Sequence, residues 1–159
     1  MAAADATDKQ APSVHASTVL VGPRAVLIRG GSGSGKSRLA LALLQAARDG
    51  RLPFARLVAD DRTRLQAANG RLLARPVPEL GGLIEARGAG IRHVPYEPVA
   101  AVFLVVDIID DLPRMPDAGD LTVIIDGISL PRLAVASAVD SLPLLLAEIV
   151  RLTDGQSPD

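Results

Sequence analysis

The chain has 159 residues, of which 48% are apolar and 22% are charged, and its formal net charge is −1. This length and composition indicate one globular domain with a sizeable core and exclude a disordered chain. The chain contains no Cys, which excludes disulfides, thiolate metal sites and cysteine nucleophiles. The near-neutral charge argues against general attraction to nucleic acid, and no apolar run reaches the roughly 18 to 20 residues that a membrane span needs.

The first dozen residues lack the basic start and apolar stretch of a signal peptide. Together with the absence of Cys, this makes a cytoplasmic protein the expectation, with no nucleic acid and no membrane among its partners. Aromatic residues are limited to two Phe and one Tyr, so the core must consist of Leu, Val, Ile and Ala. Such a core is typical of a parallel or mixed sheet covered by helices. The expected fold class is therefore α/β, with a mixed β-sheet and flanking helices.

The chain is expected to hold one domain at residues 14–152. Residues 1–13 show no periodicity and are predicted to form a disordered N-terminal arm, whereas residues 153–159 are predicted to be a frayed tail. The segment Ser141–Leu152 is predicted to be the last helix, with its first residue as a plausible N-cap and Pro143 tolerated in the first turn.

Two short apolar runs open the domain. Val14–Val21 has strand character and ends at the turn signal Gly22-Pro23. Ala25–Ile28 follows directly, so the two runs are predicted to form a hairpin. His15 lies in the first strand, where a lone His is more often a structural or surface residue than a functional one.

A glycine-rich segment follows the second strand and fits the phosphate-binding P-loop motif G-x-x-x-x-G-K-[ST]. Its residues are Gly30, Gly31, Ser32, Gly33, Ser34, Gly35, Lys36 and Ser37. Ser37–Arg48, which is rich in Leu and Ala, is predicted to be a helix that ends near Asp49-Gly50. In this context backbone N–H groups would bind phosphates, Lys36 would reach the β- and γ-phosphates, and Ser37 would ligate Mg²⁺. The alternative is a flexible Gly/Ser linker, which the flanking strand and helix argue against.

Three apolar runs end in acidic residues and compete for the role of metal-binding or proton-accepting carboxylate. Ala55–Asp61 ends in the pair Asp60 and Asp61, and two adjacent acids could divide metal binding and proton transfer between them. The runs Val102–Asp107 and Leu121–Asp126 have the same form. The pattern alone makes Asp107 an equal candidate. For the Asp60–Asp61 pair, the alternative is a polar strand end that caps the next turn, which spacing alone does not exclude.

Two further segments carry charged side chains. Gly81–Ile91 contains Glu85 and Arg87 between glycine-rich turns. An Arg beside a transferring phosphoryl group can stabilise its charge, but an ordinary loop with a solvated ion pair is as good an interpretation. Asp110–Asp117 is predicted to be a loop with Arg114 among acids.

The chain resembles the catalytic domain of bacterial HPr kinase/phosphorylase, in the short form that lacks the N-terminal domain, over roughly His15 to Arg114. His15 stands fifteen residues before Gly30, where the family places a His that assists catalysis, and the glycine-rich segment fits the family's G-x-S-G-x-G-K-S. Leu57–Arg62 is similar to the family's L-V-A-D-D-R, and Leu83–Ile91 resembles its signature L-E-I-R-G-L-G-I.

The resemblance implies a site in which Asp60 or Asp61, rather than Asp107, is the catalytic base. It also implies that Glu85 and Ser37 are the metal ligands. Arg87 or Arg114 would stabilise the transferring phosphoryl group. The catalytic set that the resemblance implies is His15, Lys36, Asp60, Asp61, Arg87 and Arg114.

The implied activity is the Mg²⁺- and ATP-dependent phosphorylation of a serine on an HPr-like phosphocarrier protein of the phosphotransferase system. Long members of the family form hexamers, so a homo-oligomer is one assembly that the resemblance implies. The family's C-terminal V-R-P-G-R run, which is tied to dephosphorylation, has no clear counterpart, so the sequence favours kinase activity over reverse phosphorolysis. Two alternatives are a P-loop kinase for a small metabolite and a non-catalytic ATP-binding regulatory module.

Overall fold

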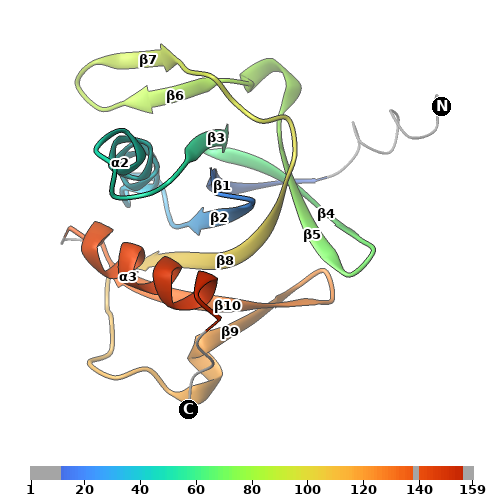
Figure 1. Cartoon of the computed structure of the whole chain (residues 1–159), viewed down its shortest axis with the longest axis vertical. Helices are drawn as coiled ribbons and strands as arrows, with labels where there is room; N and C mark the ends of the chain where they lie inside the picture. The colour runs from blue at the N-terminus through green and yellow to red at the C-terminus, as the bar shows by residue number, and fades with distance from the viewer. Residues whose placement is uncertain (1–11, 138–139, 156–159) are drawn as a thin grey trace.

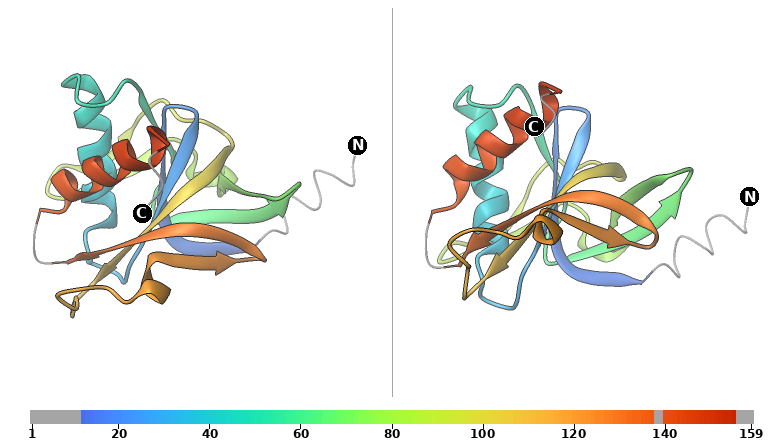
Figure 2. Two further views of the ribbon diagram at one scale, coloured as in Figure 1. Left: turned by 60° about the horizontal axis from the view of Figure 1, so that its bottom comes forward. Right: turned by 90° about the horizontal axis from the view of Figure 1, so that it is seen from below.

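The fold was determined from a computed structural model, which describes residues 12–137 and 140–155. It is a mixed α/β fold, as the sequence predicts, and both helices lie on the same side of the strands (Figures 1 and 2). The helices are α2 (Lys36–Arg48) and α3 (Leu142–Thr153), with 3-10 turns η1 (Pro78–Leu80) and η2 (Ala118–Leu121). The strands are β1 (Ser13–Val21), β2 (Arg24–Arg29), β3 (Ala55–Ala59), β4 (Arg62–Ala68), β5 (Arg71–Pro76), β6 (Leu83–Ala86), β7 (Gly90–His93), β8 (Ala100–Ile109), β9 (Thr122–Ile125) and β10 (Ile128–Ala136).

The first eleven residues of the predicted arm and the last four residues of the predicted tail lie outside the described residues. At the other end of the predicted arm, Ser13 already belongs to β1. No helix in the described part of the chain is long and apolar enough to cross a bilayer.

The sheet is mixed because β2 has an antiparallel neighbour on one side and a parallel neighbour on the other. Strand β2 pairs antiparallel with β1, as the predicted hairpin requires, and β1 pairs antiparallel with β3. On its other side β2 pairs parallel with β8, which pairs parallel with β10. The β4–β5 hairpin joins the first residues of β1 to the start of β8, so β1, β4, β5, β8 and β2 close into a ring of paired strands. The loops that follow β2 and β8 therefore leave the sheet at the same edge.

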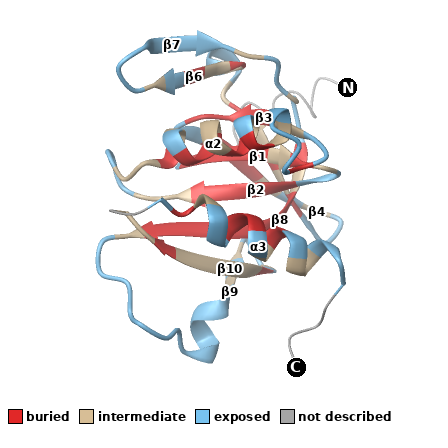
Figure 3. Cartoon of the chain, turned by 60° about the vertical axis from the view of Figure 1, so that its left-hand side comes forward, coloured by how far each residue is buried: buried red, intermediate tan, exposed pale blue. Residues whose placement is uncertain are grey.

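Alternate residues of the central strands face two separate apolar clusters, as the two-residue period of a strand requires. Val26 and Ile28 of β2 belong to the cluster beneath the helices, which also contains Leu43 of α2 and Leu145 of α3. Leu27 belongs to the cluster on the opposite face, which the β4–β5 hairpin covers. All five of these side chains are fully buried. Figure 3 shows this burial along the central strands, while the β6–β7 hairpin and the segment that contains η2 are largely exposed.

At two places the structure adds detail to the sequence expectations. The segment Gly81–Ile91, which the sequence allowed to be an ordinary loop, holds β6 and the first half of β7, which pair as an antiparallel hairpin. Ser141 occupies the N-cap position of α3, but its side chain makes no capping hydrogen bond. The carboxylate of Asp140 instead accepts a hydrogen bond from the backbone N–H of Leu142 at 3.1 Å, because an aspartate can reach the N–H two residues ahead.

Candidate active site

The glycine-rich loop, residues 30–35, connects β2 to α2 at the edge where the parallel strands end. Gly33 and Gly35 have φ angles of +77° and +104°, a region that L-residues with side chains rarely adopt. Gly35 is the N-cap of α2, so the backbone of the loop lies at the positive end of the helix dipole. Lys36 is 5% exposed, and its Nζ donates to the carbonyl oxygen of Gly31 at 3.0 Å. The ammonium group is thereby folded against the loop.

Asp60 lies directly after β3 and is 8% exposed. Its carboxylate accepts hydrogen bonds from the Ser37 hydroxyl at 2.8 and 2.9 Å and from the Ser17 hydroxyl at 2.7 Å. The backbone N–H of Glu85 donates to the same carboxylate at 3.0 Å. Asp60 therefore connects the start of α2, strand β1 and the β6–β7 hairpin.

Asp61 turns away from Asp60 because its φ angle of +64° takes the backbone out of the strand conformation. Its side chain is 59% exposed, and its Oδ1 lies 2.5 Å from Nε2 of His15. In the tautomer with a proton on Nε2, the imidazole donates this hydrogen bond. A non-glycine residue in this conformation is uncommon, and such backbone strain is concentrated at functional sites. The structure thus places His15 and Asp61 together, as one accessible acid–imidazole pair.

The β6–β7 hairpin forms the opposite side of a cleft of about 480 Å³ over the glycine-rich loop. Ile84 is 1% exposed and anchors the hairpin in the core beneath the helices, while the Glu85 side chain is exposed. The hairpin is also held at Gly81, where an added Cβ would lie 2.8 Å from the Tyr96 ring. The cleft is lined by Ser32, Gly33, Gly35, Lys36, Ser37, Arg38, Leu41, Asp61, Glu85, Ala86 and Arg87.

The cleft brings together most of the residues that the sequence singled out. Within residues 12–137 and 140–155, no three His, Asp or Glu side chains gather as an all-protein metal site would require. The oxygens of Ser37, Asp60 and Glu85 are nevertheless hard donors, and Mg²⁺ commonly uses one or two carboxylates together with phosphate oxygens. The donor set therefore fits a metal ion that is held jointly with a phosphate group.

Arg114 is exposed in the loop after β8 and is not among the residues that line the cleft. Gly30 and Gly31, although part of the glycine-rich motif, are also absent from the lining. Gly30 instead sits where an added Cβ would lie 2.4 Å from Ser34 Oγ and 3.3 Å from Ile108 Cβ. The absence of a side chain at Gly30 lets the loop pack closely on the end of β8.

Asp107 is the other acid that the pattern allowed as a metal-binding or proton-accepting group. Two arginines bind its carboxylate. Its carboxylate accepts from Arg29 Nε at 2.7 Å and Arg29 Nη2 at 2.8 Å, and from Arg132 Nε at 2.6 Å. Burial alone would raise the pKa of Asp107, but the hydrogen bonds and charges of Arg29 and Arg132 outweigh burial and lower it. The same contacts raise the pKa of Arg29, even though burial opposes that shift. Asp107 is thus part of an ion-pair network at the end of β2, the strand that precedes the glycine-rich loop.

Ser17 is a site residue that the sequence reasoning missed. It is completely buried; its hydroxyl donates to Asp60 and accepts from the backbone N–H of Asp61 at 3.1 Å. It therefore orients both aspartates from strand β1. His15 and Ser17 are two residues apart in β1, so their side chains lie on the same face of the strand. Only the pairing of β1 with β3 brings that face to the acids.

Comparison with known proteins gives consistent results. The family model for the HPr serine kinase C-terminal domain matches residues 8–96. HPr kinase/phosphorylase of Limosilactobacillus reuteri is 33% identical over 136 residues, which are 77% of this chain and 40% of that protein. HPr kinase/phosphorylase of Shouchella clausii is 41% identical over 83 residues, or 52% of this chain and 24% of that protein. The chain thus spans less than half the length of these curated relatives.

The fold is also similar to a solved structure, that of the Hpr(Ser) kinase/phosphatase from Coxiella burnetii. The TM-score is 0.71, the sequence identity is 28%, and the match covers 90% of each chain. The family match includes the glycine-rich loop, Asp61 and the β6–β7 hairpin, which contribute to the cleft, and also His15 and Asp60, which contact Asp61 and Ser37. The chain therefore belongs to the HPr serine kinase C-terminal domain family.

Proposed function

We propose that the chain is a Mg²⁺- and ATP-dependent serine kinase whose protein substrate is an HPr-like phosphocarrier of the phosphotransferase system. The names of the relatives support this substrate class. The observation that supports the proposal is that two adjacent acids beside the glycine-rich loop have different surroundings. Asp60 is buried against the Ser37 hydroxyl, and Asp61 is exposed beside His15.

The glycine-rich loop is proposed to be a P-loop that holds the phosphates of ATP. Its backbone N–H groups and the N-terminus of α2 attract anions, and Lys36 can exchange its contact with the Gly31 carbonyl for a phosphate oxygen. Ser37, Asp60 and Glu85 would hold Mg²⁺. When bound, the ion neutralises charge on the phosphate oxygens.

The proposed reaction is phosphoryl transfer to a serine hydroxyl. The serine Oγ forms a bond to the γ-phosphorus of ATP, the bond between that phosphorus and the bridging oxygen breaks, and ADP leaves with the electron pair. Asp61 accepts the hydroxyl proton, while His15 holds the Asp61 carboxylate in place. Arg87 lies on the cleft and is the proposed partner of the transferring group, whereas a role for Arg114 stays a prediction. Positioning and electrostatic stabilisation supply most of the catalysis in such reactions.

The direct test is to incubate the purified chain with labelled ATP, Mg²⁺ and purified HPr and to identify phosphoserine in HPr by mass spectrometry. The proposal requires labelling of HPr whose initial rate falls by about 10² to 10⁴ in Asp61→Asn. ATP turnover with a small hydroxyl compound but without labelled HPr would instead support a metabolite kinase. ATP binding without transfer to any acceptor would support a regulatory module. Incubation of phosphorylated HPr with inorganic phosphate tests separately for the reverse phosphorolysis.

A further inference from the structure

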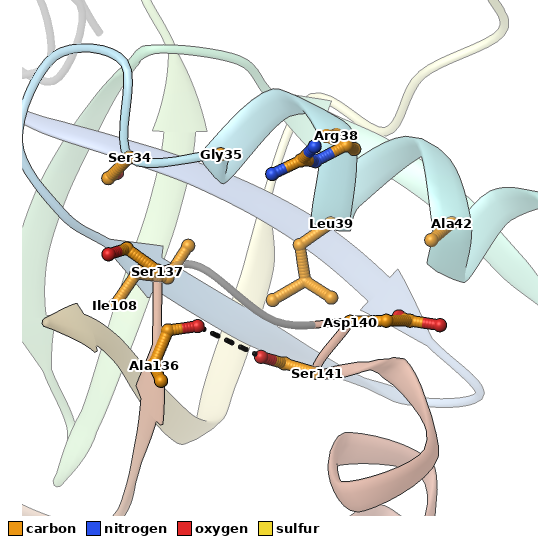
Figure 4. Close-up of a pocket in the computed structure, with 10 residues that line it drawn as sticks. All are labelled: Ser34, Gly35, Arg38, Leu39, Ala42, Ile108, Ala136, Ser137, Asp140 and Ser141. Carbon is orange, nitrogen blue, oxygen red and sulfur yellow. Dashed lines mark hydrogen bonds between the residues drawn. The ribbon is translucent and has the colours of Figure 1, made fainter. Parts of the chain in front are cut away.

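Strand β9 lies at one outer edge of the main sheet (Figures 1 and 2). It pairs on one side with β10, and β10 pairs in turn with β8. Figure 4 shows the ends of these two inner strands, with Ile108 of β8 near Ala136 of β10 at a pocket beside α2. No strand within the described residues pairs with the other side of β9. The outer backbone groups of β9 are therefore available to a further strand.

The register of the β9–β10 hairpin decides which backbone groups face outward. Ile125 lies opposite Ile128 across a two-residue turn in which both residues have positive φ angles. In such a hairpin the pair that flanks the turn is hydrogen-bonded, and the pairs beyond it alternate between non-hydrogen-bonded and hydrogen-bonded. The N–H and C=O groups of Val123 therefore point toward β10, whereas those of Thr122 and Ile124 point away from it.

The side chains of β9 also suit contact with another strand. Residues 121–125 read Leu-Thr-Val-Ile-Ile, without a charged residue or a proline, and β-branched residues favour strand pairing. Ile124 and Leu121 are 72% and 51% exposed, whereas Val123 and Ile125 pack against the apolar cluster on the β4–β5 side of the sheet. Edge strands of native proteins are often protected by a charged side chain, a proline or a bulge. Strand β9 has none of these within its own length.

Acidic residues stand at both ends of β9. Asp117 and Asp120 precede the strand, and Asp126 follows it. None of their three carboxylates forms an ion pair within the described part of the chain. Residues 110–127 contain five Asp and one Arg, although the net charge of the whole chain is only −1. The surface around β9 is therefore strongly negative.

This charge decides what kind of strand can pair with β9. If β9 of a second copy paired with it in the antiparallel direction, Asp126 of each copy would lie near Asp120 of the other. In the parallel direction, each of these acids would lie near its own counterpart. Like charges that face each other across a strand pair are destabilising. Strand β9 is thus unsuited to pairing with itself and suited to a segment with positively charged ends.

We propose that β9 is the docking edge for an extended segment of another protein, with β-branched apolar residues in its middle and Lys or Arg at each end. The segment adds to the sheet as a further strand, the first of the common modes of peptide recognition. Its backbone bonds to the outward groups of Thr122 and Ile124, and its basic ends lie near Asp120 and Asp126. This surface is separate from the cleft, so the proposal does not rest on the proposed kinase function.

The test uses the full chain and two synthetic peptides. One peptide is Lys-Lys-Val-Thr-Val-Thr-Val-Lys-Lys, and the other has Glu in place of all four Lys. Fluorescence anisotropy of the labelled peptides measures their affinities at low and high salt. We expect the Lys peptide to bind about tenfold or more tightly than the Glu peptide, and we expect high salt to reduce the difference. Equal binding of the two peptides, or binding of neither, overturns the proposal.

Ile124→Lys and Ile91→Lys are a matched pair of variants. Ile91 is 69% exposed in β7, a second short and exposed strand, but the charged residues around it, Arg87 and Arg92, are basic. We expect Ile124→Lys to weaken binding of the Lys peptide about tenfold, because it adds a positive charge to the docking edge. Ile91→Lys should change that affinity less than about twofold. Equal losses in the two variants would contradict the assignment to β9.

Amide hydrogen exchange, followed by NMR, tests the geometry without a variant. In the free chain, the N–H groups of Thr122 and Ile124 should exchange faster than that of Val123, which bonds to β10. A saturating amount of the Lys peptide should slow exchange at Thr122 and Ile124 about tenfold or more and leave Ile91 unchanged. Binding without this protection would mean that the peptide does not add as a strand, which overturns the proposal. A dimer in sedimentation velocity that Ile124→Lys abolishes would make a second copy the occupant and would overturn it as well.

Discussion

Asp60 and Asp61 are adjacent in the sequence, but their carboxylates have different partners and different exposure. Asp60 is 8% exposed and bonds to the hydroxyls of Ser37 and Ser17, whereas the Asp61 side chain is 59% exposed and bonds to His15. The left-handed backbone of Asp61 separates the two side chains. A buried acid beside the loop serine suits metal binding, and an accessible acid beside an imidazole suits proton transfer.

The first prediction is that amide substitutions separate these two roles. Asp61→Asn should lower the rate of phosphoryl transfer to HPr by about 10² to 10⁴, because the proton acceptor is lost, while the dissociation constant of Mg-ATP stays within about threefold. Asp60→Asn should weaken Mg-ATP binding by about 10- to 100-fold, because an oxygen near the metal and its hydrogen-bond network are lost. Calorimetry and single-turnover transfer assays measure the two effects. The reverse pattern would exchange the assigned roles.

The second prediction concerns Ser17, whose buried hydroxyl holds Asp60 and the backbone of Asp61. Ser17→Ala should lower transfer by about 10- to 100-fold and raise the Mg²⁺ concentration needed for half-maximal rate, because groups that orient metal ligands have effects of this size. Thr18→Val is the matched control. It also removes a buried hydroxyl from β1, but Thr18 bonds to Thr63 rather than to an aspartate. An equal change in Mg²⁺ dependence for both variants would mean that Ser17 has only a structural role.

The third prediction distinguishes two adjacent glycines of the loop. An added Cβ at Gly30 would lie 2.4 Å from Ser34 Oγ and 3.3 Å from Ile108, whereas one at Gly31 meets nothing within 4 Å. Gly30→Ala should destabilise the chain by about 1 to 3 kcal/mol, as overpacking does, and should weaken ATP binding. Gly31→Ala should stay near wild type in both. Urea unfolding with the double variant Gly30→Ala/Ser34→Ala should recover part of the loss, since the closest contact is removed. A lack of recovery would place the strain at Ile108 instead.

Local sequence signals were sufficient for the elements that carry the loop. The apolar runs and the turn signal Gly22-Pro23 predicted the β1–β2 hairpin, and the Leu- and Ala-rich run predicted α2, both of which are confirmed. The β4–β5 hairpin was missed, although Asn69-Gly70 has the sequence of a two-residue hairpin turn and both residues have positive φ. Strand β10 was missed because it contains Pro131, which lies where β10 pairs with the short strand β9.

The arrangement of the site could not be predicted from any single segment of the sequence. Three apolar runs end in Asp, and only the tertiary structure separates Asp60, at the loop serine, from Asp107, between two arginines. The position of Asp126 in the β9–β10 turn likewise follows from strand pairing. The resemblance to a family favoured Asp60 and Asp61 over Asp107 as the catalytic base, and this choice stays a prediction. Ser17 carried no recognisable signal, because its role depends on how β1 aligns with the end of β3.

The last prediction concerns the pH dependence that Asp107 gives to stability. The pKa of Asp107 is lowered in the folded chain because its carboxylate is held by Arg29 and Arg132. A carboxyl group with a lowered folded pKa stabilises the fold above its unfolded pKa of about 4, and this contribution is lost as pH falls through the folded pKa. Asp107→Asn should therefore lower the free energy of unfolding by about 2 kcal/mol at pH 7, since charged hydrogen bonds become neutral. The difference from wild type should shrink below about pH 4.

Urea unfolding of both proteins from pH 7 to pH 3 measures this convergence. Asp126→Asn is the control, because Asp126 is exposed in a turn and asparagine also accepts a positive φ angle. It should follow wild type across the whole range. A difference for Asp107→Asn that persists unchanged at pH 3 would mean that the substitution acts through shape and packing. In that case the two arginines would not be held by the charge of Asp107, and the ion-pair network would add little to the stability of the sheet edge that carries the glycine-rich loop.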